Sequence, residues 1–494
     1  MSKAFNVKKY LKLQSEEILK RTKKFDNKLY IEFGGKLFDD FHASRVLPGF
    51  APNSKLELLK CLKDKLEIIF CINADDIEKK KIRADHGITY DMEILRLISV
   101  LNGMGMIVNS VVITQYTGQA SAEIFKNKLE RNNIKTYIHT NTLGYPTDVD
   151  TIVSDVGYGA NSYIETTRPL IVVAAPGPKS GKLGTCLSQL YHEYKRGIKA
   201  GYVKYETFPV WNLPLKHPVN VAYEASTADL NDKIMIDPFH LANYKQSAVN
   251  YNRDIEVFPI LKNILEKIMG KCPYNSPTDM GVNVIGSCID NKEEIENAAR
   301  SEIIRRYYKY LCDYKEGIID ESVPNHIKLL MNELNIGLEA REVIKAAMDK
   351  YDKCHLPTFA IALNKRKIIT GRQTDIMSAP TSAFINAIKH YAKIADEIHL
   401  LSPKVLEPML NVKKEVFNEK NPRLNLQDVL IGLSLTALTN PTVEVALNNI
   451  KKFKGLDAHS SFIISPADQT ILRNLGINYT SEPEFYLNNI YLEN

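Results

Sequence analysis

The chain has 494 residues, more than one hydrophobic core usually organises, so we expect two or three domains. Hydrophobic residues make up 44% and charged residues 25%, which is the composition of an ordinary soluble globular protein. The 64 basic and 58 acidic residues leave a formal charge of only +6. This balance argues against a nucleic-acid-binding protein but is compatible with a local basic pocket for a small anion.

Seven cysteines are scattered along the chain without C-x-x-C spacing. The pattern disfavours a disulfide framework and a structural zinc site, and it fits a reducing cytosol. The first residues lack the apolar segment of a signal peptide, and the longest apolar runs are far too short to span a bilayer. We therefore expect a cytoplasmic protein that does not act at a membrane.

Strands and helices alternate through region 1–225. We predict strands over 28–33, 66–73, 108–114, 135–140 and 170–175, and helices over 54–65, 90–103 and 120–133. Alternation of this kind indicates an α/β fold with a largely parallel sheet. Because the strands are continuously apolar, we expect helices to cover the sheet on both faces.

Region 226–355 has a mainly helical character. Helices are predicted over 255–269 and 326–334, and Asp290 to Glu293 resembles a capping box. Apolar residues follow every four positions from Ile295 to Leu311, which predicts one buried helix stripe.

Region 356–494 returns to an α/β pattern and is predicted to form a separate C-terminal domain. We expect a hairpin of strands 358–363 and 367–370, further strands over 397–401 and 460–465, and helices over 382–395 and 467–475. Three more helices are expected between 406 and 453. The predicted architecture is thus an N-terminal α/β domain, a helical middle region and a C-terminal α/β domain.

The run from Leu170 to Thr185 reads as a buried strand, a tight Gly/Pro loop ending in Gly-Lys, and an amphipathic helix. This order is typical of a phosphate-binding loop, because the loop exposes backbone N–H groups and the helix start adds partial positive charge. The candidate phosphate-binding residues are Gly177, Lys179, Ser180, Gly181, Lys182 and Thr185.

The match to the Walker A loop, G-x-x-x-x-G-K-[ST], is incomplete. Pro176 stands where the first glycine is expected, and Leu183 replaces the hydroxyl that binds magnesium. Thr185, three residues after Lys182, could substitute for that hydroxyl. The alternative is a plain strand-to-helix turn whose glycines serve only its geometry.

A second polar cluster follows the strand 28–33. Gly34 and Gly35 would let the backbone approach a ligand closely, and Lys36 and Arg45 could bind its anionic groups. A solvated turn with surface ion pairs explains the same residues equally well.

Two further loops carry candidate chemistry. Arg83, Asp85 and His86 combine a basic, an acidic and a titratable group, which suits proton transfer, although a charged loop is the simpler interpretation. Asp155 follows Thr151, Ile152 and Val153 and could be a metal ligand of the Walker B kind.

Carboxylates and histidines are dense between 217 and 240. Asp237 could hold Mg²⁺ and His240 could act as a base, although no spacing here is diagnostic of a metal site. Near the C-terminus, His459 is either a structural histidine or the base of a pocket. A serine hydrolase is disfavoured because the chain has no G-x-S-x-G motif.

Several long strings resemble one bacterial family, UPF0371, also called DUF1846. They are residues 33–50 (FGGKLFDDFHASRVLPGF), 175–193 (APGPKSGKLGTCLSQLYHE), 237–240 (DPFH), 276–283 (SPTDMGVN) and 458–460 (AHS). The resemblance covers essentially the whole chain. It implies the three-part α/β architecture and a cytoplasmic bacterial protein, and it carries over no catalytic residue.

The leading hypothesis is a cytosolic enzyme that binds a nucleotide or phosphorylated metabolite and transfers a phosphoryl or nucleotidyl group. Lys182 and backbone N–H groups would hold phosphates, Asp155 or Asp237 would hold Mg²⁺, and Arg45 or Arg83 would neutralise developing charge. The candidate cofactors are Mg²⁺ and ATP or another nucleotide.

Two alternatives remain open. In one, the loop only anchors a phosphorylated substrate, and His86, His240 or His459 serves as the base of a hydrolase, isomerase or group transferase. In the other, the chain is a nucleotide-binding sensor or assembly protein without catalysis. In each case we expect a phosphorylated small-molecule ligand and a homo-oligomer, with no nucleic acid or membrane as partner.

Overall fold

The computed structural model describes residues 4–83, 87–364 and 367–486. The chain folds into two compact units. The first comprises Met1–Glu224 and Asn231–Ala299, and the second comprises Ala225–Leu230 and Arg300–Asn494. Of the predicted middle region, residues 231–299 belong to the first unit, and residues 226–230 and 300–355 belong to the second.

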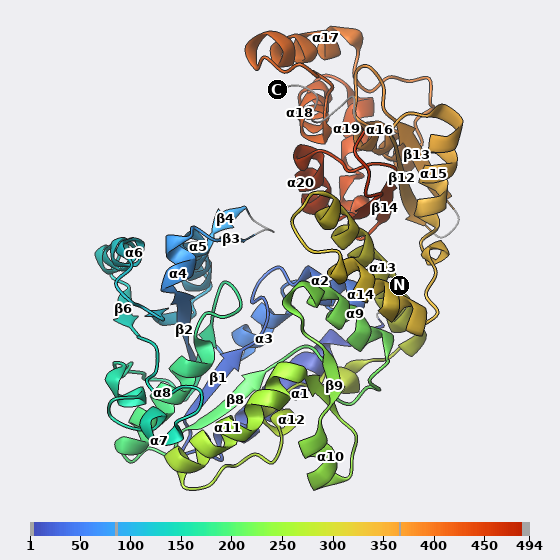
Figure 1. The fold of residues 1–494 in the computed structure, drawn as a ribbon. Helices are drawn as coiled ribbons and strands as arrows, with labels where there is room; N and C mark the ends of the chain where they lie inside the picture. The colour runs from blue at the N-terminus through green and yellow to red at the C-terminus, as the bar shows by residue number, and fades with distance from the viewer. Residues whose placement is uncertain (1–3, 84–86, 365–366, 487–494) are drawn as a thin grey trace. The chain divides into compact units, whose positions relative to one another are not determined.

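A seven-stranded sheet, parallel throughout, forms the centre of the first unit (Figure 1). Its strands stand in the order β11-β8-β1-β7-β2-β5-β6. Their bounds are β1 Leu29–Phe33, β2 Leu66–Asn73, β5 Ile107–Thr114, β6 Lys135–Ile138, β7 Leu170–Ala174, β8 Gly201–Tyr205 and β11 Gly281–Val282. The predicted parallel sheet is confirmed.

The central strands are buried along their whole length, as their continuous apolar sequences predict. All eight residues of β2 and all five of β7 are buried. Strand β7 pairs with β1 on one side, with Leu29 opposite Leu170, and with β2 on the other, with Phe70 opposite Ala174. A strand that is apolar on both faces needs a layer of helices on each side.

Those helices, with two small antiparallel ribbons, complete the first unit. The helices are α1 Val7–Thr22, α2 Phe41–Val46, α3 Ser54–Cys61, α4 Ala74–Glu78, α5 Tyr90–Gly103, α6 Ala120–Arg131, α7 Val149–Ile152, α8 Lys182–Lys195, α9 Pro218–Ser226, α10 Pro238–Tyr244, α11 Asn252–Met269, α12 Pro277–Met280 and α13 Lys292–Lys315, of which α9 and α13 continue into the second unit. The ribbons pair β3 Ile82–Arg83 with β4 Ile88–Thr89, and β9 Ile234–Ile236 with β10 Val249–Tyr251.

The two helix layers follow from the direction of the crossovers. The connections that leave β2 and β5 run toward β6, whereas the connection that leaves β7 runs back toward β8. Since crossovers between parallel strands are right-handed, α5 and α6 cover one face and α8 covers the other. Helix α11 packs against α8.

Strand β8 was not among the predicted elements. It begins with a glycine and carries two tyrosines and Lys204 rather than a run of Val, Ile or Leu, so its sequence gives a weak strand signal. It is nevertheless held at full length beside β1, from Leu29 opposite Gly201 to Phe33 opposite Tyr205.

The second unit contains a four-stranded mixed sheet in the order β13-β12-β14-β15. The strands are β12 Thr358–Asn364, β13 Lys367–Arg372, β14 Asp457–Ser460 and β15 Asn478–Ser481. β12 runs antiparallel to β13 and β14, and β14 runs parallel to β15. The predicted hairpin of β12 and β13 and the separate C-terminal α/β core are confirmed.

Helices surround this second sheet and share its core. They are the later part of α13, with α14 Ser322–Glu333, α15 Glu342–Cys354, α16 Ala379–Ala392, α17 Pro403–Asn411, α18 Leu426–Ala437, α19 Pro441–Leu447 and α20 Pro466–Asn474. Buried side chains of α16, α18 and α19 form one cluster with Phe359 and Ile361 of β12.

Three local predictions for the later part of the chain were wrong in detail. Residues 397–401 form no strand: Leu400 and Leu401 are buried, but they pack in a turn region. The strand predicted over 460–465 lies earlier, as β14. The cap of α13 is Asn291 rather than Asp290, because Asn291 Oδ1 accepts the N–H of Glu294 at 3.1 Å.

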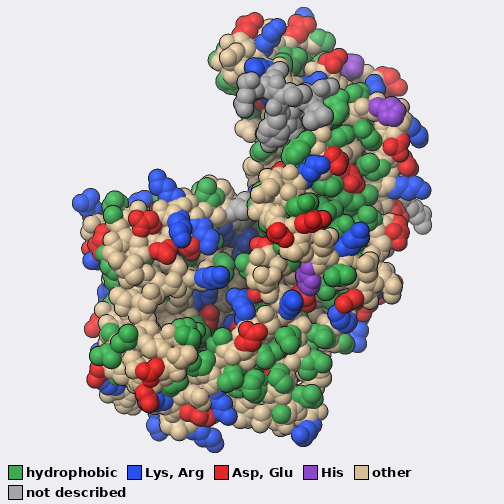
Figure 2. All heavy atoms as spheres, in the orientation of Figure 1, with side chains coloured by type: hydrophobic (Ala, Val, Ile, Leu, Met, Phe, Trp, Pro, Cys, Tyr) green, Lys and Arg blue, Asp and Glu red, His purple; other side chains and the backbone are tan. Residues whose placement is uncertain are grey.

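Charges of both signs are interspersed over the face seen in Figure 2, as the near balance of basic and acidic residues predicts. Among the described residues, no helix combines the length and the apolar character needed to cross a membrane.

Candidate functional site

The candidate phosphate loop lies where the winding of the sheet reverses. Strand β7 stands between β1 and β2, and the chain leaves β7 in the direction opposite to that in which it leaves β2. In open parallel sheets, ligands bind at the carboxyl ends of strands that flank such a reversal. The loops after β1, β7, β2 and β5 therefore meet at one edge, which brings Gly34, Gly35 and Lys36 to the same edge as residues 177–182.

The loop after β7 is held by polar side chains from the two strands beside it. Thr114 Oγ1, at the end of β5, donates to the Ser180 carbonyl at 2.8 Å. Asn73 Nδ2, at the end of β2, donates to the Lys179 carbonyl at 3.4 Å. In a trans peptide the N–H points away from the C=O, so the N–H groups of Ser180 and Gly181 point away from these strands.

Several backbone donors of this segment have no acceptor. Among the described residues, none accepts a hydrogen bond from the N–H of Ser180, Gly181 or Lys182, or from the next two residues of α8. The cap residue Gly181 offers no side chain to the first turn. The unsatisfied N–H groups of a helix start, with the helix dipole, form a ready anion-binding site.

Two lysines accompany these donors. Lys182, the first residue of α8, is half-buried, and its Nζ lies 3.5 Å from Ser180 Oγ. Lys179 is exposed and takes a left-handed conformation, with φ of 57°. Within the described part of the chain neither lysine has a carboxylate partner, so both positive charges are available to a ligand.

Glycine is required at two positions of the loop. Gly181 has a φ of 80°, and a Cβ there would lie 2.7 Å from Thr114 Oγ1. A Cβ on Gly177 would overlap the ring and hydroxyl of Tyr90, the first residue of α5. These contacts press the loop against β5 and α5, so its donors are held in one arrangement.

Thr185 does not take the role of the missing Walker hydroxyl. Its side chain is buried beneath α8, and its Oγ1 accepts from the Cys71 thiol of β2 at 3.4 Å. The hydroxyl therefore faces the sheet rather than the loop. Burial raises the pKa of Cys71 to about 12, so this thiol stays protonated beneath the helix.

The loop after β1 combines a backbone approach with a buried ion pair. Gly34 N–H donates to the Tyr205 carbonyl at 3.0 Å, and Gly35 has a φ of 69°. Behind them, Lys55 Nζ pairs with Asp40 at 2.8 Å and is almost fully buried. Burial alone would raise the pKa of Asp40, but the Lys55 ammonium holds it below its ordinary value. Lys36 is exposed beside this pair.

The predicted arginines lie on elements that flank this loop. Arg45 is half-buried in the last turn of α2. Arg83 is buried; it pairs with Glu93 of α5, and its Nη2 donates to the Phe38 carbonyl at 3.4 Å. Glu93 offsets the Arg83 charge, so the guanidinium ties α5 to the loop after β1. Asp85 and His86 lie outside the described residues.

Asp155 does not follow a strand, which removes the Walker B comparison. Thr151 and Ile152 belong to α7, Val153 caps the end of that helix, and the side chain of Asp155 is 78% exposed. Its carboxylate accepts from Tyr191 at 2.8 Å and pairs with Lys195, both in the later turns of α8. Lys195 and Tyr191 lower the pKa of Asp155 through these hydrogen bonds. The residue is thus far along α8 from the phosphate loop.

Asp237 and His240 join α10 to α12 near the β11 edge of the sheet. Asp237 is fully buried; it caps α10 by accepting the His240 N–H at 3.0 Å and accepts from Thr278 Oγ1 at 2.6 Å. His240 Nδ1 lies 3.1 Å from Ser276 Oγ. β11 is three strands from β7, so these residues are not part of the phosphate-loop cluster.

His459 belongs to the second unit and is buried within its sheet. Nδ1 lies 2.8 Å from Thr480 Oγ1, and Nε2 lies 3.2 Å from Glu482 Oε1. Burial lowers the pKa of His459. With both ring nitrogens bonded inside the fold, the geometry favours a structural histidine over a pocket base.

Comparison with known proteins accounts for nearly the whole chain. The family models "Domain of unknown function DUF1846, N-terminal" and "Domain of unknown function DUF1846, C-terminal" match residues 3–335 and 339–491. A UPF0371 protein of Clostridioides difficile (strain 630) is 52% identical over 502 residues, which cover 99% of this chain and 100% of that protein. The chain belongs to the UPF0371 family. A UPF0371 protein of Clostridium botulinum (strain Langeland) is 53% identical over 501 residues, 99% of each chain.

This UPF0371 chain also has a partly buried charge cluster that the sequence did not reveal. It follows the missed strand β8, where Lys204 Nζ pairs with Glu206 at 2.9 Å and with Asp254 of α11. Tyr202 donates to Glu32 of β1 at 2.7 Å. Burial raises the pKa of Glu206 to about 7. The cluster places a carboxyl that titrates near neutrality at the carboxyl edge of β8.

The residues that hold the loop were also missed, although a signal for them exists. Asn73 and Thr114 are the last residues of two strands whose ends were predicted correctly. A polar residue at the carboxyl end of a buried parallel strand lies at the ligand-binding edge. That rule would have selected both residues for the UPF0371 site without knowledge of the strand order.

Proposed function

We propose that this UPF0371 chain binds a phosphorylated small molecule, a nucleotide or a phosphorylated metabolite, at the start of α8. One observation carries the proposal: successive N–H groups from Ser180 have no acceptor among the described residues, at an uncapped helix start beside Lys182. Phosphate oxygens would accept from these donors, and the ammonium of Lys182 would offset their charge.

We propose further that the phosphate serves as an anchor, with the chemistry performed on another part of the ligand. The placement of the candidate metal ligands supports this choice. Asp155 and Asp237 share no partner and are each bonded elsewhere, and the Thr185 hydroxyl faces β2. Among the described residues, no three His, Cys, Asp or Glu side chains converge as metal ligands. Phosphoryl transfer would need a metal held in another way, usually by substrate phosphates and few carboxylates.

Binding is tested by titrating the full chain and its Lys182→Ala variant with AMP, ATP and a sugar phosphate, each with and without Mg²⁺. A ligand at 100 times its Kd should stabilise the wild type by about 2.7 kcal/mol. We expect a thermal shift without Mg²⁺ that Lys182→Ala reduces. Lys195→Ala is the matched control, because this lysine lies on the same helix but pairs with Asp155.

The outcomes separate the three candidate functions. A shift that requires Mg²⁺ would support phosphoryl or nucleotidyl transfer instead of anchoring. A metal-independent shift with no turnover of any bound ligand would favour a sensor or assembly protein. Equal shifts in the wild type and in Lys182→Ala would contradict the phosphate site itself.

A further inference from the structure

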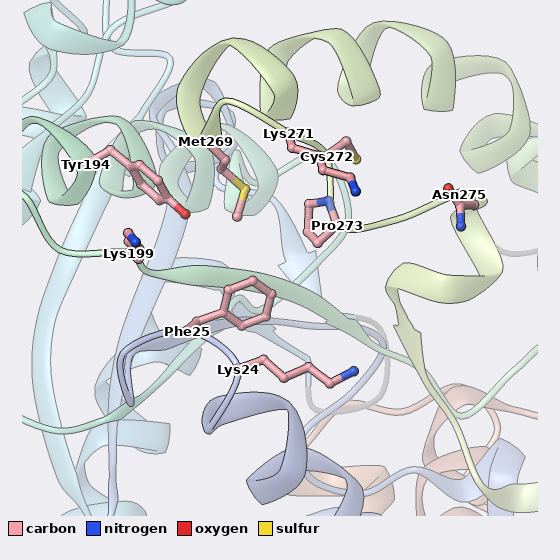
Figure 3. A pocket seen from close by; sticks show the side chains of 9 residues that line it. All are labelled: Lys24, Phe25, Tyr194, Lys199, Met269, Lys271, Cys272, Pro273 and Asn275. Carbon is pink, nitrogen blue, oxygen red and sulfur yellow. The ribbon is translucent and has the colours of Figure 1, made fainter.

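A cavity of about 450 Å³ lies in the first unit, at the edge of the sheet opposite to the phosphate loop (Figure 3). Lys24 and Phe25 come from the segment before β1, and Lys199 from the segment before β8. Because all seven strands are parallel, these segments meet at the amino edge. Tyr194 closes the cavity from the end of α8, which is about 21 Å long at 1.5 Å per residue, so the two sites lie at opposite ends of one helix.

Three lysines line this cavity: Lys24, Lys199 and Lys271. All three are exposed, and within the described part of the chain none of their ammonium groups has a hydrogen-bond or carboxylate partner. Other lysines on the neighbouring helices are paired: Lys195 of α8 with Asp155, and Lys267 of α11 with Asp150. The cavity is thus lined by three lysines whose ammonium groups no ion pair of the described residues neutralises.

In the described part of the chain, the acidic groups around the cavity form no ion pair with its three lysines. Asp26 Oδ2 accepts the backbone N–H of Lys199 at 3.2 Å and does not bond to its ammonium group. Asp279 is bonded to the Asn275 N–H at 3.0 Å and to Tyr244 at 2.6 Å. α1, α8 and α11 end nearby, and each helix end adds about half a negative charge, which reduces the positive potential.

The wall between the lysines is apolar and aromatic. Phe25 is buried, with its ring against the Cα of Gly201, where a Cβ would overlap it. Met269 and the Tyr194 ring complete this wall. Burial raises the pKa of Tyr194, so its hydroxyl remains a donor at neutral pH. A bare inorganic anion would leave this surface uncovered.

We propose that this cavity is a second ligand site that binds an amphipathic organic anion, an apolar or aromatic body carrying a phosphate or carboxylate group. The anionic group lies among the three lysines, and the body covers Phe25, Met269 and Tyr194. The site is independent of the phosphate loop, and the two can succeed or fail separately.

The test is calorimetric titration with phenyl phosphate, inorganic phosphate and benzyl alcohol. It uses the full chain carrying Lys182→Ala, so that the loop does not contribute. We expect phenyl phosphate to bind at least tenfold more tightly than inorganic phosphate, and benzyl alcohol not to bind. Adding Lys24→Ala, Lys199→Ala and Lys271→Ala together should weaken phenyl phosphate at least tenfold. Lys23→Ala, which removes an exposed lysine at the end of α1 outside the cavity lining, should leave it unchanged.

Three results would overturn the proposal. They are the absence of phenyl phosphate binding at millimolar concentration, equal affinity in the triple variant, and equal affinity for inorganic and phenyl phosphate. If the lysines only complement helix ends, the triple variant will lower the melting temperature and leave the titration unchanged. Circular dichroism checks its folding, and Lys271→Glu alone provides a second test.

Discussion

Helices α8 and α18 begin in opposite ways, although both follow a loop into a packed helix. At α18, Asn425 Oδ1 accepts the N–H of Asp428 at 3.1 Å, and the Asn425 N–H donates to Asp428 Oδ2 at 2.9 Å. The Leu426 N–H donates to Asp468 at 2.8 Å. At α8, the cap is Gly181, no side chain of the described residues caps the first turn, and the first helical residue is Lys182.

The difference shows how a candidate site can be recognised in a fold of this size. Side chains usually satisfy the orphan N–H groups of a helix start, as at α18, because buried donors without partners are costly. The start of α8 keeps its donors unsatisfied while Thr114, Asn73 and Tyr90 fix its geometry. Rigid donors without partners among the described residues support the proposed ligand site, whereas the satisfied donors of α18 have a structural role.

The largest effect is expected from Gly181→Ala. The added Cβ would meet Thr114 while the backbone stays in the left-handed region, so we expect about 3 kcal/mol of destabilisation and loss of phosphate binding. Gly184→Ala is the matched control: a Cβ there meets nothing within 4 Å, and alanine favours the helix by about 1 kcal/mol. Denaturant unfolding and ligand titration measure both. If the two variants behaved alike, the loop before α8 would be an ordinary turn and not a constrained loop.

The next effect is a pH dependence of stability, expected from Glu206. This residue follows β8 at the same sheet edge, but its carboxylate pairs with Lys204. Burial raises its pKa to about 7, so between pH 4.5 and 7 the folded state binds more protons than the unfolded state. The free energy of unfolding therefore falls as pH rises through this range, on the order of 3 kcal/mol from this group. Glu206→Gln removes that component.

Unfolding of both proteins should be measured from pH 4 to 8. The stability of Glu206→Gln relative to the wild type should rise between pH 4.5 and 7 and level off above it. Ligand binding at the loop should not change. A difference that is constant with pH would show that Glu206 titrates at its ordinary value.

A smaller effect is expected at the satisfied helix start. Asn425→Ala removes the acceptor for the Asp428 N–H and should destabilise the protein by about 1 kcal/mol, with phosphate binding unchanged. Asn425→Ser keeps an acceptor and should restore most of the loss. If Asn425→Ala also weakened ligand binding, the start of α18 could no longer serve as the structural counterpart of the α8 site.

Much of the fold could be predicted because its central strands carry their signal locally. β2 and α5 have their predicted bounds, and β7 ends one residue early, since the apolar patterns of these elements are local. Strand β8 was missed because its stability comes from pairing with β1, not from its composition. Residues 400–401 show the converse: short apolar runs are buried in turns as readily as in strands.

The site was predictable in part for the same reason. Lys182 and Gly181 lie within the local motif, so the sequence alone selects them. The hydrogen bond from Thr114 to Ser180 joins residues 66 positions apart, and it depends on a strand order that the sequence does not state. The strand end expected before Asp155 was wrong, because Thr151 and Ile152 look alike in a strand and in the short helix α7.

The smallest effect is expected from Thr185→Val, which asks whether the α8 site is a Walker site after all. The hydroxyl contacts the Cys71 thiol, a weak partner, so its removal should change stability by about 0.5 kcal/mol or less. The thermal shift produced by each phosphorylated ligand, with and without Mg²⁺, should match that of the wild type. A hydroxyl that bound magnesium would behave differently, because Thr185→Val would then abolish only the Mg²⁺-dependent part of the shift. Thr185 lies on the sheet side of α8, whereas the unsatisfied N–H groups lie on the loop side. A Walker loop combines phosphate binding with magnesium binding, and this geometry separates the groups that would perform them.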